Sequence, residues 1–172
     1  MKTIEIRRHS IRNRAQADLS EEGLVLANMV GLEMGNFDRV LASPLLRAIQ
    51  TAEAMGYPVD EIVELLASTG NAVEIECPWP ASFAEYAAAF HKNGSTARYA
   101  QRLADFYGKL VESLPEGGAA LVVNHGGVVE LSAIACLPIA DYAAMGDYID
   151  YCEGVRLTWE DGKFTSVQVL RV

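Results

Sequence analysis

The run Ala119-Ala120-Leu121-Val122-Val123 carries no polar side chain, and it constrains the fold more than any other segment. A β-strand with one face in water alternates apolar and polar residues, whereas a strand covered on both faces is apolar throughout. The ranges 3–7 and 39–42 are also strand-like, and stretches with helical spacing follow both of them. Strands that alternate with helices predict an α/β domain of three layers, α/β/α, with a mostly parallel central sheet.

Capping residues mark where helices are expected to begin. Ser20 is predicted to cap a helix that ends at Gly35-Asn36. Ser43 is predicted to cap a second helix with Pro44 at its first position, where the missing N–H of proline costs nothing. Helical spacing predicts three further helices over 82–90, 95–114 and 128–135.

The remaining strands are harder to place. Either 59–66 or 72–76 is expected to form the third strand of the sheet. The segment 155–172 is expected to be a C-terminal β-hairpin about Asp161-Gly162, because Asp-Gly favours tight turns between strands. A length of 172 residues predicts one domain, residues 1–172, with a substantial core.

Charge and cysteine content exclude several classes of protein. The formal net charge is -9, which disfavours nucleic acid and anionic membranes as partners because both attract basic proteins. No run approaches the roughly 20 apolar residues of a membrane span, and the N-terminus is charged where a signal peptide is apolar. Cys77, Cys136 and Cys152 form no C-x-x-C motif, so neither a disulfide framework nor a zinc site is indicated, and a cytoplasmic location is expected.

Two histidines occupy the same kind of position. His9 follows the first strand beside Arg8, and His125 follows the apolar run and precedes Gly126. In open parallel sheets, ligands bind at the strand ends where loops and helix N-termini meet. An imidazole can attack phosphorus, and a guanidinium can hold phosphate oxygens with two hydrogen bonds. The two positions therefore indicate phosphoryl chemistry.

Three segments together resemble the motifs of the histidine phosphatase superfamily, also called phosphoglycerate-mutase-like. Arg8-His9-Ser10 is similar to the R-H-G motif of the family, with serine in place of glycine, and His125-Gly126 is similar to its late H-G. The segment 19–23 resembles the family's L-S/T-x-x-G helix start. The longest motif, S-x-L-x-R-A-x-Q-T-A, is matched by Ser43, Leu45, Arg47, Ala48, Gln50, Thr51 and Ala52.

The resemblance implies a role for each motif residue. His9 would be the nucleophile that forms a phosphohistidine, and Arg8 and Arg47 would bind the transferring phosphoryl group. His125 would complete the phosphate pocket as a hydrogen-bond donor, helped by protonation. Arg47 is expected in the first turn of its helix, where backbone N–H groups also favour an anion. No metal and no cofactor is implied, and the partner is a small phosphorylated substrate, either a phosphomonoester or a phosphohistidine.

A general acid must protonate the leaving oxygen, and the resemblance implies a carboxylate after the second motif. Glu64, in a β-like run, is the first candidate. Glu74 and Glu76 are the alternatives in the next β-like run, and a substrate with a good leaving group would need no acid.

Departures from the family's pattern favour a small phosphatase. Ser10 adds a hydroxyl beside the nucleophile, and Arg12, Asn13 or Arg14 is expected to replace family residues in substrate binding. The loops after His9 and between the second and third motifs are short, which leaves room only for a small cap around 77–100. A phosphoglycerate-mutase-type phosphoryl transfer and a phosphate-binding module with little catalysis remain the alternatives.

Other polar and aromatic residues are assigned structural roles. Arg7 is expected to face solvent or form an ion pair, because strand alternation places it opposite Arg8. His91 and Glu130 are expected on the surface. Packing within the cap is expected for three aromatic residues, Trp79, Phe83 and Tyr86.

Overall fold

The apolar run lies in β4 (Ala119–Asn124), inside a six-stranded sheet of the computed structural model, which describes residues 1–172. The strand order is β3-β2-β4-β1-β5-β6. β3, β2, β4 and β1 run parallel to one another. β5 pairs antiparallel with β1, and β6 pairs antiparallel with β5 as the predicted hairpin. The other strands are β1 (Lys2–Arg8), β2 (Arg39–Ala42), β3 (Glu61–Ile62), β5 (Gly154–Glu160) and β6 (Lys163–Leu170).

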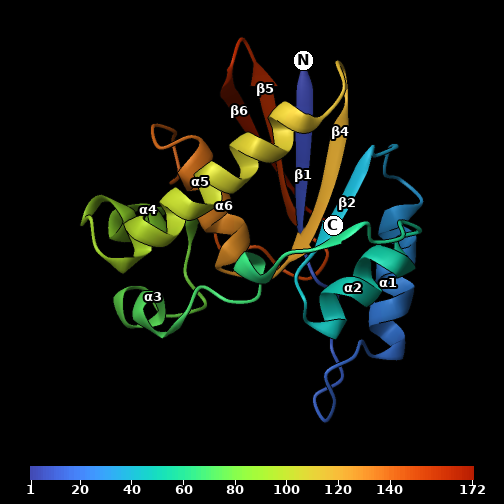
Figure 1. The fold of residues 1–172 in the computed structure, drawn as a ribbon. Coiled ribbons are helices and arrows are strands. Elements are labelled where there is room, and N and C mark those ends of the chain that lie inside the picture. Colours follow the sequence, from blue (N-terminus) through green and yellow to red (C-terminus); the bar gives the residue numbers. More distant parts are fainter.

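Helices cover both faces of this sheet (Figure 1). One layer contains α1 and α2, and α4, α5 and α6 form the other, so the predicted three-layer α/β architecture is confirmed. The helices are α1 (Glu21–Gly31), α2 (Leu46–Ala54), α3 (Asn71–Glu76), α4 (Phe83–His91), α5 (Ser95–Ser113) and α6 (Val128–Cys136). None of them is long and apolar enough to cross a membrane.

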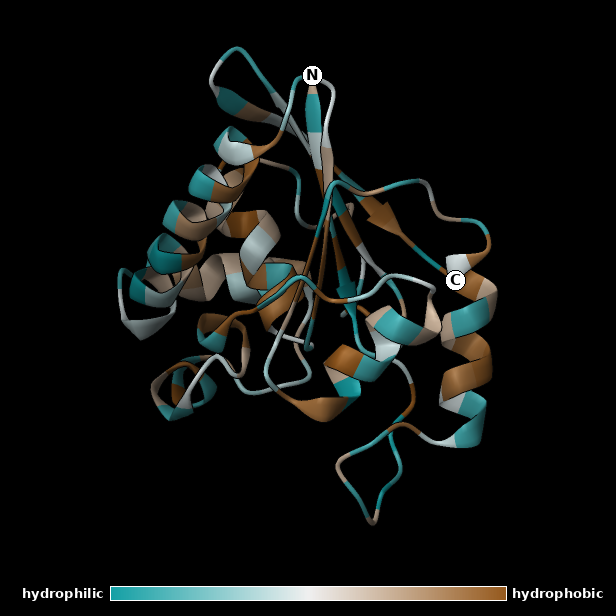
Figure 2. Ribbon diagram, turned by 45° about the vertical axis from the view of Figure 1, so that its right-hand side comes forward, coloured by the Kyte–Doolittle hydropathy of each residue, from teal (hydrophilic) through white to brown (hydrophobic).

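The side chains of β4 divide between two cores. Ala120 and Val122 belong to the larger core under α4, α5 and α6, whereas Leu121 and Val123 pack with α2 on the opposite face. All four residues have no exposed surface. Figure 2 shows the apolar central strands enclosed between the helical layers. The uninterrupted apolar run is therefore explained by burial on both faces.

β1 places an ion pair on the face opposite its apolar residues. Glu5 is 2% exposed, and one of its carboxylate oxygens lies 2.7 Å from Nη2 of Arg7. The other oxygen accepts a hydrogen bond of 2.7 Å from Nη2 of Arg156 on β5. The ion pair expected for Arg7 is confirmed, and two guanidinium groups compensate the buried carboxylate, which would otherwise be costly.

The sequence predicts the N-cap of α1 correctly and the N-cap of α2 incorrectly. Ser20 accepts a hydrogen bond of 3.1 Å from the backbone N–H of Gly23, so its predicted role as N-cap of α1 is confirmed. The prediction for α2 is wrong, because the helix begins at Leu46 with Leu45 at its N-cap position. The hydroxyl of Ser43 contacts the imidazole of His125 instead of capping α2.

The region between α2 and α4 contains less strand than expected. β3 is only two residues long, and Glu64 follows it in a 3₁₀ turn, Glu64–Leu66, so its predicted β-like setting is wrong. The strand proposed for 72–76 is the helix α3. Alternating apolar and acidic residues imitate a strand there, but Val73 is buried while Ile75 is 84% exposed. Only one apolar residue of this segment reaches the core, and a short helix suffices to bury it.

We expect two Gly→Ala substitutions to affect stability in opposite directions. A Cβ on Gly154 of β5 would lie 2.0 Å from the backbone oxygen of Ile6 on β1, so Gly154→Ala must separate two paired strands and will lower the free energy of unfolding. Gly108 of α5 has nothing within 4 Å of such a Cβ, and Gly108→Ala should add about 0.5–1 kcal/mol through helix propensity. Urea denaturation of both variants tests the pair, and a neutral Gly154→Ala would contradict the close strand contact.

Candidate active site

The pairing of β1 with β4 brings the two motif histidines together. Arg8 is in register with Asn124, and the backbone N–H of His9 donates to the carbonyl of Asn124 at 2.8 Å. The residues that follow the two strands, His9 and His125, therefore lie side by side, with ring centroids 5.1 Å apart. α2 starts at the same edge of the sheet and contributes Arg47 from its first turn, as expected.

A cavity of about 500 Å³ opens at this edge. Its lining includes His9, His125, Arg8 and Arg47, so the structure brings four of the five predicted site residues together. Glu64, the fifth, is exposed and is not part of the lining. The remaining lining residues are Arg12, Ala67, Ser68, Thr69, Glu74, Trp79, Gly126, Val128 and Tyr151.

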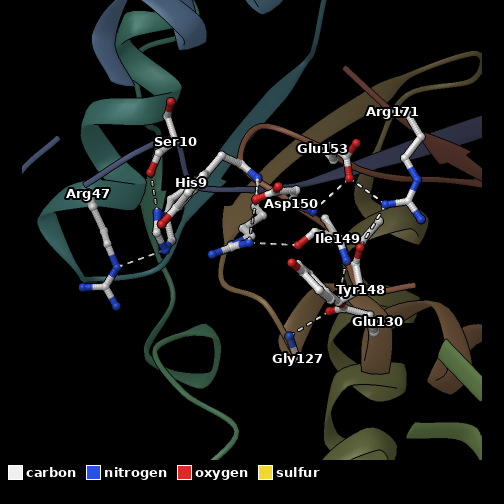
Figure 3. Close-up of polar contacts among 12 residues, drawn as sticks. His9, Ser10, Arg47, Gly127, Glu130, Tyr148, Ile149, Asp150, Glu153 and Arg171 are labelled. Atoms are coloured by element: carbon white, nitrogen blue, oxygen red, sulfur yellow. Dashed lines mark hydrogen bonds and ion pairs between the residues drawn. The ribbon is translucent and has the colours of Figure 1, made fainter. Parts of the chain in front are cut away.

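The ring of His9 is buried and hydrogen-bonded at both nitrogens (Figure 3). Nδ1 lies 2.7 Å from the carbonyl oxygen of Ser10 and must donate to it, because a carbonyl can only accept. Nε2 accepts a hydrogen bond of 3.2 Å from Nε of Arg47. Burial, with the nearby charges of Arg47, Arg8 and Arg12, lowers the pKa of His9 from 6.5 to about 3, against the opposing hydrogen bond to Ser10. The imidazole is therefore neutral, with its lone pair on Nε2.

Ser10 and the second motif fix the loop that carries His9. Ser10 is fully buried, its hydroxyl donates to the carbonyl of Gly23 on α1 at 2.7 Å, and its N–H donates to Oγ1 of Thr51 at 2.9 Å. Gln50 accepts a hydrogen bond of 2.8 Å from the N–H of Leu19 at the end of the same loop. The serine that replaces a motif glycine thus ties the loop to α1 and does not line the cavity.

His125 is held through one nitrogen only. Nε2 lies 2.7 Å from the hydroxyl of Ser43, and that hydroxyl also accepts from the N–H of Leu45 at 3.3 Å. The Ser43 proton can then bond to Nε2, which leaves the imidazole proton on Nδ1, a buried atom with no partner. Burial and the neighbouring His9, Arg47 and Arg8 lower the pKa of His125 to about 3. The free protein therefore carries a neutral His125 here, not the protonated form that would assist an anion most.

The guanidinium of Arg8 is positioned by a carbonyl, a carboxylate and two rings. Nη1 donates to the carbonyl of Ile149 at 3.1 Å and to Oδ1 of Asp150 at 3.3 Å. The group lies 4.2 Å from the ring centroid of Tyr151 and 5.0 Å from that of Trp79, which are cation–π distances. Nε is buried without a partner. The protein therefore fixes the guanidinium of Arg8 through Nη1, and the edge that contains Nε keeps its donors unused.

Arg47 and Arg12 add two further positive charges to the cavity. The pKa of Arg47 is lowered by burial first and then by the charges of Arg12 and Arg8, so the three guanidinium groups are close enough to repel one another. Arg12 makes no ion pair, although an isolated bridge to Leu19 fixes its backbone. Of the three residues expected to replace family residues in substrate binding, only Arg12 lines the cavity.

The three candidate acids have different environments. Glu76 caps α5, where it accepts hydrogen bonds from the backbone N–H groups of Ser95 and Thr96, and these bonds lower its pKa to about 2. Glu74 lines the cavity. Its carboxylate accepts from Oγ1 of Thr69 at 3.0 Å and from the N–H of Trp79 at 3.1 Å. The structure therefore places Glu74 beside the histidines and excludes Glu64 from the cavity.

The residues assigned to structural roles divide into confirmed and wrong predictions. His91 is exposed, and Phe83 and Tyr86 are fully buried in the larger core, as predicted. Trp79 packs against the larger core, as predicted, and it also lines the cavity and stacks on Arg8. Glu130 was expected on the surface but is fully buried. The helical pattern does not predict this burial, because it assumes one exposed face, whereas α6 buries all of its first seven residues.

The charge of the cavity opposes that of the whole chain. Three guanidinium groups surround it, and only one carboxylate, that of Glu74, belongs to its lining. Such local focusing attracts an anion to a protein whose net charge is -9. The chain contains no group of three or more His, Cys, Asp or Glu side chains arranged to hold a metal ion.

Comparisons with known proteins agree with this geometry. A search of curated proteins finds no match. Phosphoserine phosphatase from Entamoeba histolytica, solved with 3-phosphoglyceric acid, superimposes with a TM-score of 0.73 at 17% identity, over 100% of this chain and 98% of that one. A mycobacterial glucosyl-3-phosphoglycerate phosphatase, solved with VO3, gives 0.72 at 20% identity, over 99% and 98%. A family model matches residues 3–170, and the chain therefore belongs to the histidine phosphatase superfamily, branch 1.

Proposed function

We propose that this protein is a phosphatase that hydrolyses a small phosphomonoester through a phosphohistidine on Nε2 of His9. The observation that carries the proposal is a neutral imidazole whose lone pair on Nε2 lies in a cavity with three guanidinium groups. A nucleophile needs that lone pair, and a transferring phosphoryl group needs positive charge around its oxygens. Membership of the superfamily supports the same chemistry.

The first step transfers the phosphoryl group to the protein. Nε2 of His9 attacks phosphorus, the P–N bond forms, and the bond from phosphorus to the ester oxygen breaks in line with the attack. The unused edge of Arg8 and the terminal nitrogens of Arg47 bind the phosphoryl oxygens, and the oxygens take over the donor that Arg47 directs at His9 in the free protein. Arg12 adds a third charge at the same cavity.

His125 completes the phosphate pocket in this proposal. The unpartnered Nδ1 of His125 is the donor that we assign to a phosphoryl oxygen. Its proton does not depend on an acidic medium, because Ser43 holds the neutral ring in the tautomer that carries hydrogen on Nδ1. Positioned donors of this kind stabilise the charge that develops in the transition state.

Glu74 is the general acid and base in this proposal. Its carboxyl group gives a proton to the leaving ester oxygen in the first step. In the second step, water attacks phosphorus, gives its proton to Glu74, and the electrons of the P–N bond return to Nε2. The products are an alcohol and inorganic phosphate. Thr69 and the backbone of Trp79 fix the carboxyl group, which limits the positions that the acid can take.

The size and polarity of the cavity support a small polar substrate. The space of about 500 Å³ exceeds a phosphoryl group and leaves room for a small polar leaving group beside Ser68 and Thr69. Trp79, in the segment 77–100 that we propose as a small cap, closes one side. The similar structures are named for phosphatases of phosphoserine and of glucosyl-3-phosphoglycerate, which are phosphorylated metabolites.

We expect His9→Gln to abolish turnover and phosphoenzyme formation. The substitution removes the nucleophile, so hydrolysis of p-nitrophenyl phosphate should fall by at least about 10³-fold. Intact-mass analysis after an alkaline quench, which preserves phosphohistidine, should show a phosphate adduct on the wild type and none on the variant. The exposed third histidine provides a matched control, and His91→Gln should retain wild-type activity. An active His9→Gln protein would rule out the proposed intermediate.

We expect Glu74→Gln to discriminate between leaving groups. Alkyl phosphates need protonation of the leaving oxygen, and their kcat/KM should fall by about 10²–10⁴-fold. The kcat/KM for p-nitrophenyl phosphate should change far less, because p-nitrophenolate leaves without a proton and this parameter does not report the later attack of water. Glu64→Gln is the matched control and should leave both values unchanged. Equal losses on the two substrates would assign Glu74 to binding.

The neutral histidines also predict how stability depends on pH. The pKa of His9 and of His125 is lowered from 6.5 to about 3, so the unfolded chain binds protons in this interval that the folded protein does not. Their contribution is complete above pH 6.5 and is lost as the pH falls toward 3. Burial raises the pKa of Glu130 from 4.5 to about 7, which acts in the opposite direction, since its contribution is lost as the pH rises through 7.

Two histidines outweigh one carboxyl group, so acid should destabilise the protein. Between about pH 6 and about pH 5, replacing His9 by Gln should reduce the slope of unfolding free energy against pH by about 1.4 kcal/mol per pH unit, the value of one proton. Glu130→Gln should make the slope steeper. Urea titrations of the wild type and both variants measure these slopes, and identical slopes would contradict the buried neutral state of His9.

A further inference from the structure

Glu130 accepts hydrogen bonds from two different segments of the chain (Figure 3). Its Oε2 accepts from the N–H of Gly127 at 2.7 Å, directly after the loop of His125. Its Oε1 accepts from the N–H of Ile149 at 2.8 Å, in the long connection between α6 and β5. The side chain is fully buried and forms no ion pair, so its only partners are backbone donors.

The contact with Ile149 continues to a residue of the site. The N–H of Ile149 bonds to Glu130, and the carbonyl of the same residue accepts from Nη1 of Arg8 at 3.1 Å. The next two residues also touch Arg8, Asp150 through its carboxylate and Tyr151 through its ring. The backbone that positions the guanidinium of Arg8 is therefore attached to the core through Glu130.

A helix cap alone does not account for this arrangement. Glu130 is the third residue of α6 and closes a capping interaction with Gly127, a role that an exposed side chain fills elsewhere in this chain, in Glu85 of α4. The second bond, to Ile149, goes beyond the capping role. A carboxylate is the side chain of this length that accepts at both oxygens, whereas glutamine would direct an N–H₂ group at one of the two backbone donors.

The connection that carries Ile149 has little regular structure of its own. Residues 137–153 contain no helix or strand, and Arg171 holds them from the outside through the carbonyls of Met145, Asp147 and Tyr148. Glu130 holds the same connection from the inside, together with Arg7 and Arg8, which donate to the carbonyls of Cys152 and Ile149. A chain of hydrogen bonds in a buried setting strengthens each of its members.

We propose that Glu130 is a positioning residue that holds the phosphate-binding edge of Arg8 and the loop of His125 in one fixed relation. This inference rests on the proposed phosphatase function, because it concerns the anion that Arg8 binds. Glu130 does not touch the substrate. It acts through Ile149 on one side of the cavity and through Gly127 on the other, so its loss should weaken anion binding before it affects the chemical step.

The test is a double-mutant cycle read out by binding of inorganic phosphate in calorimetry. Glu130→Gln and Arg8→Gln should each weaken phosphate binding by about tenfold or more, and the double variant should bind more tightly than the product of the two losses predicts, because part of the effect of Glu130 passes through Arg8. Losses that multiply would overturn the proposal, because they would show that Glu130 does not act through Arg8. Unchanged affinity in Glu130→Gln would overturn it as well.

Further variants separate positioning from loss of fold. Glu5 is the other carboxylate of the chain with almost no exposed surface, and it lies outside the cavity. Glu5→Gln should lower the free energy of unfolding without changing phosphate affinity. If Glu130→Gln does not fold, Glu130→Asp keeps a carboxyl group at α6 but is one carbon too short to reach both donors. It should weaken phosphate binding and expose the Ile149 amide to hydrogen exchange, and wild-type values would overturn the proposal.

The same titration distinguishes failure of the inference from failure of the function. A wild-type protein that binds phosphate and hydrolyses phosphomonoesters, with an unaffected Glu130→Gln variant, would remove the positioning role only. A wild-type protein that neither binds phosphate nor hydrolyses any phosphomonoester would remove the proposed function, and the inference with it.

Discussion

The parallel pairing of β1 with β4 is the interaction on which the site depends. It continues one residue beyond β1, where the N–H of His9 donates to the carbonyl of Asn124, and this bond fixes the two histidines in adjacent positions. Both strands are buried on both faces, so a shift in register would move apolar side chains between two cores. The stability of the sheet and the geometry of the site are therefore set by the same backbone contacts.

The cavity concentrates like charges and keeps its histidines neutral. Burial first, and then the charges of nearby guanidinium groups, lowers the pKa of His9 and of His125, and the three guanidinium groups also repel one another. The repulsion between the guanidinium groups is unfavourable in the empty protein and is relieved when an anion binds among them. In the proposed function, binding energy is directed to a phosphoryl group in this way. Ser43, Thr51 and Gln50 of the long motif do not line the cavity. They fix His125, Ser10 and Leu19 through hydrogen bonds.

Patterns that involve residues close together in the sequence predict the fold and the motif residues at the centre of the candidate site. They fail for residues whose partners lie far away in the sequence. The apolar run of β4 and the cap Ser20 act within a few residues, so the layers and most helices follow from the sequence. The sequence does not show that Glu74 lines the cavity and Glu64 does not, because this depends on how the segment between β3 and α4 packs. Glu130 reads as a surface residue, since its second partner lies 19 positions away, at Ile149.

The indole ring of Trp79 lies between Arg8 on one side of the site and Gly126 on the other. It stacks on Arg8, and a Cβ added to Gly126 would lie 2.2 Å from the same ring, so the indole fills the space between the first and third motifs. The chain has two tryptophans, and the other, Trp159, packs against Phe164 in the C-terminal hairpin. One of the two indoles therefore lies beside the cationic group that an anion would engage, and the other lies in the hairpin. Occupation of the cavity would change the surroundings of Trp79 and leave those of Trp159 as they are.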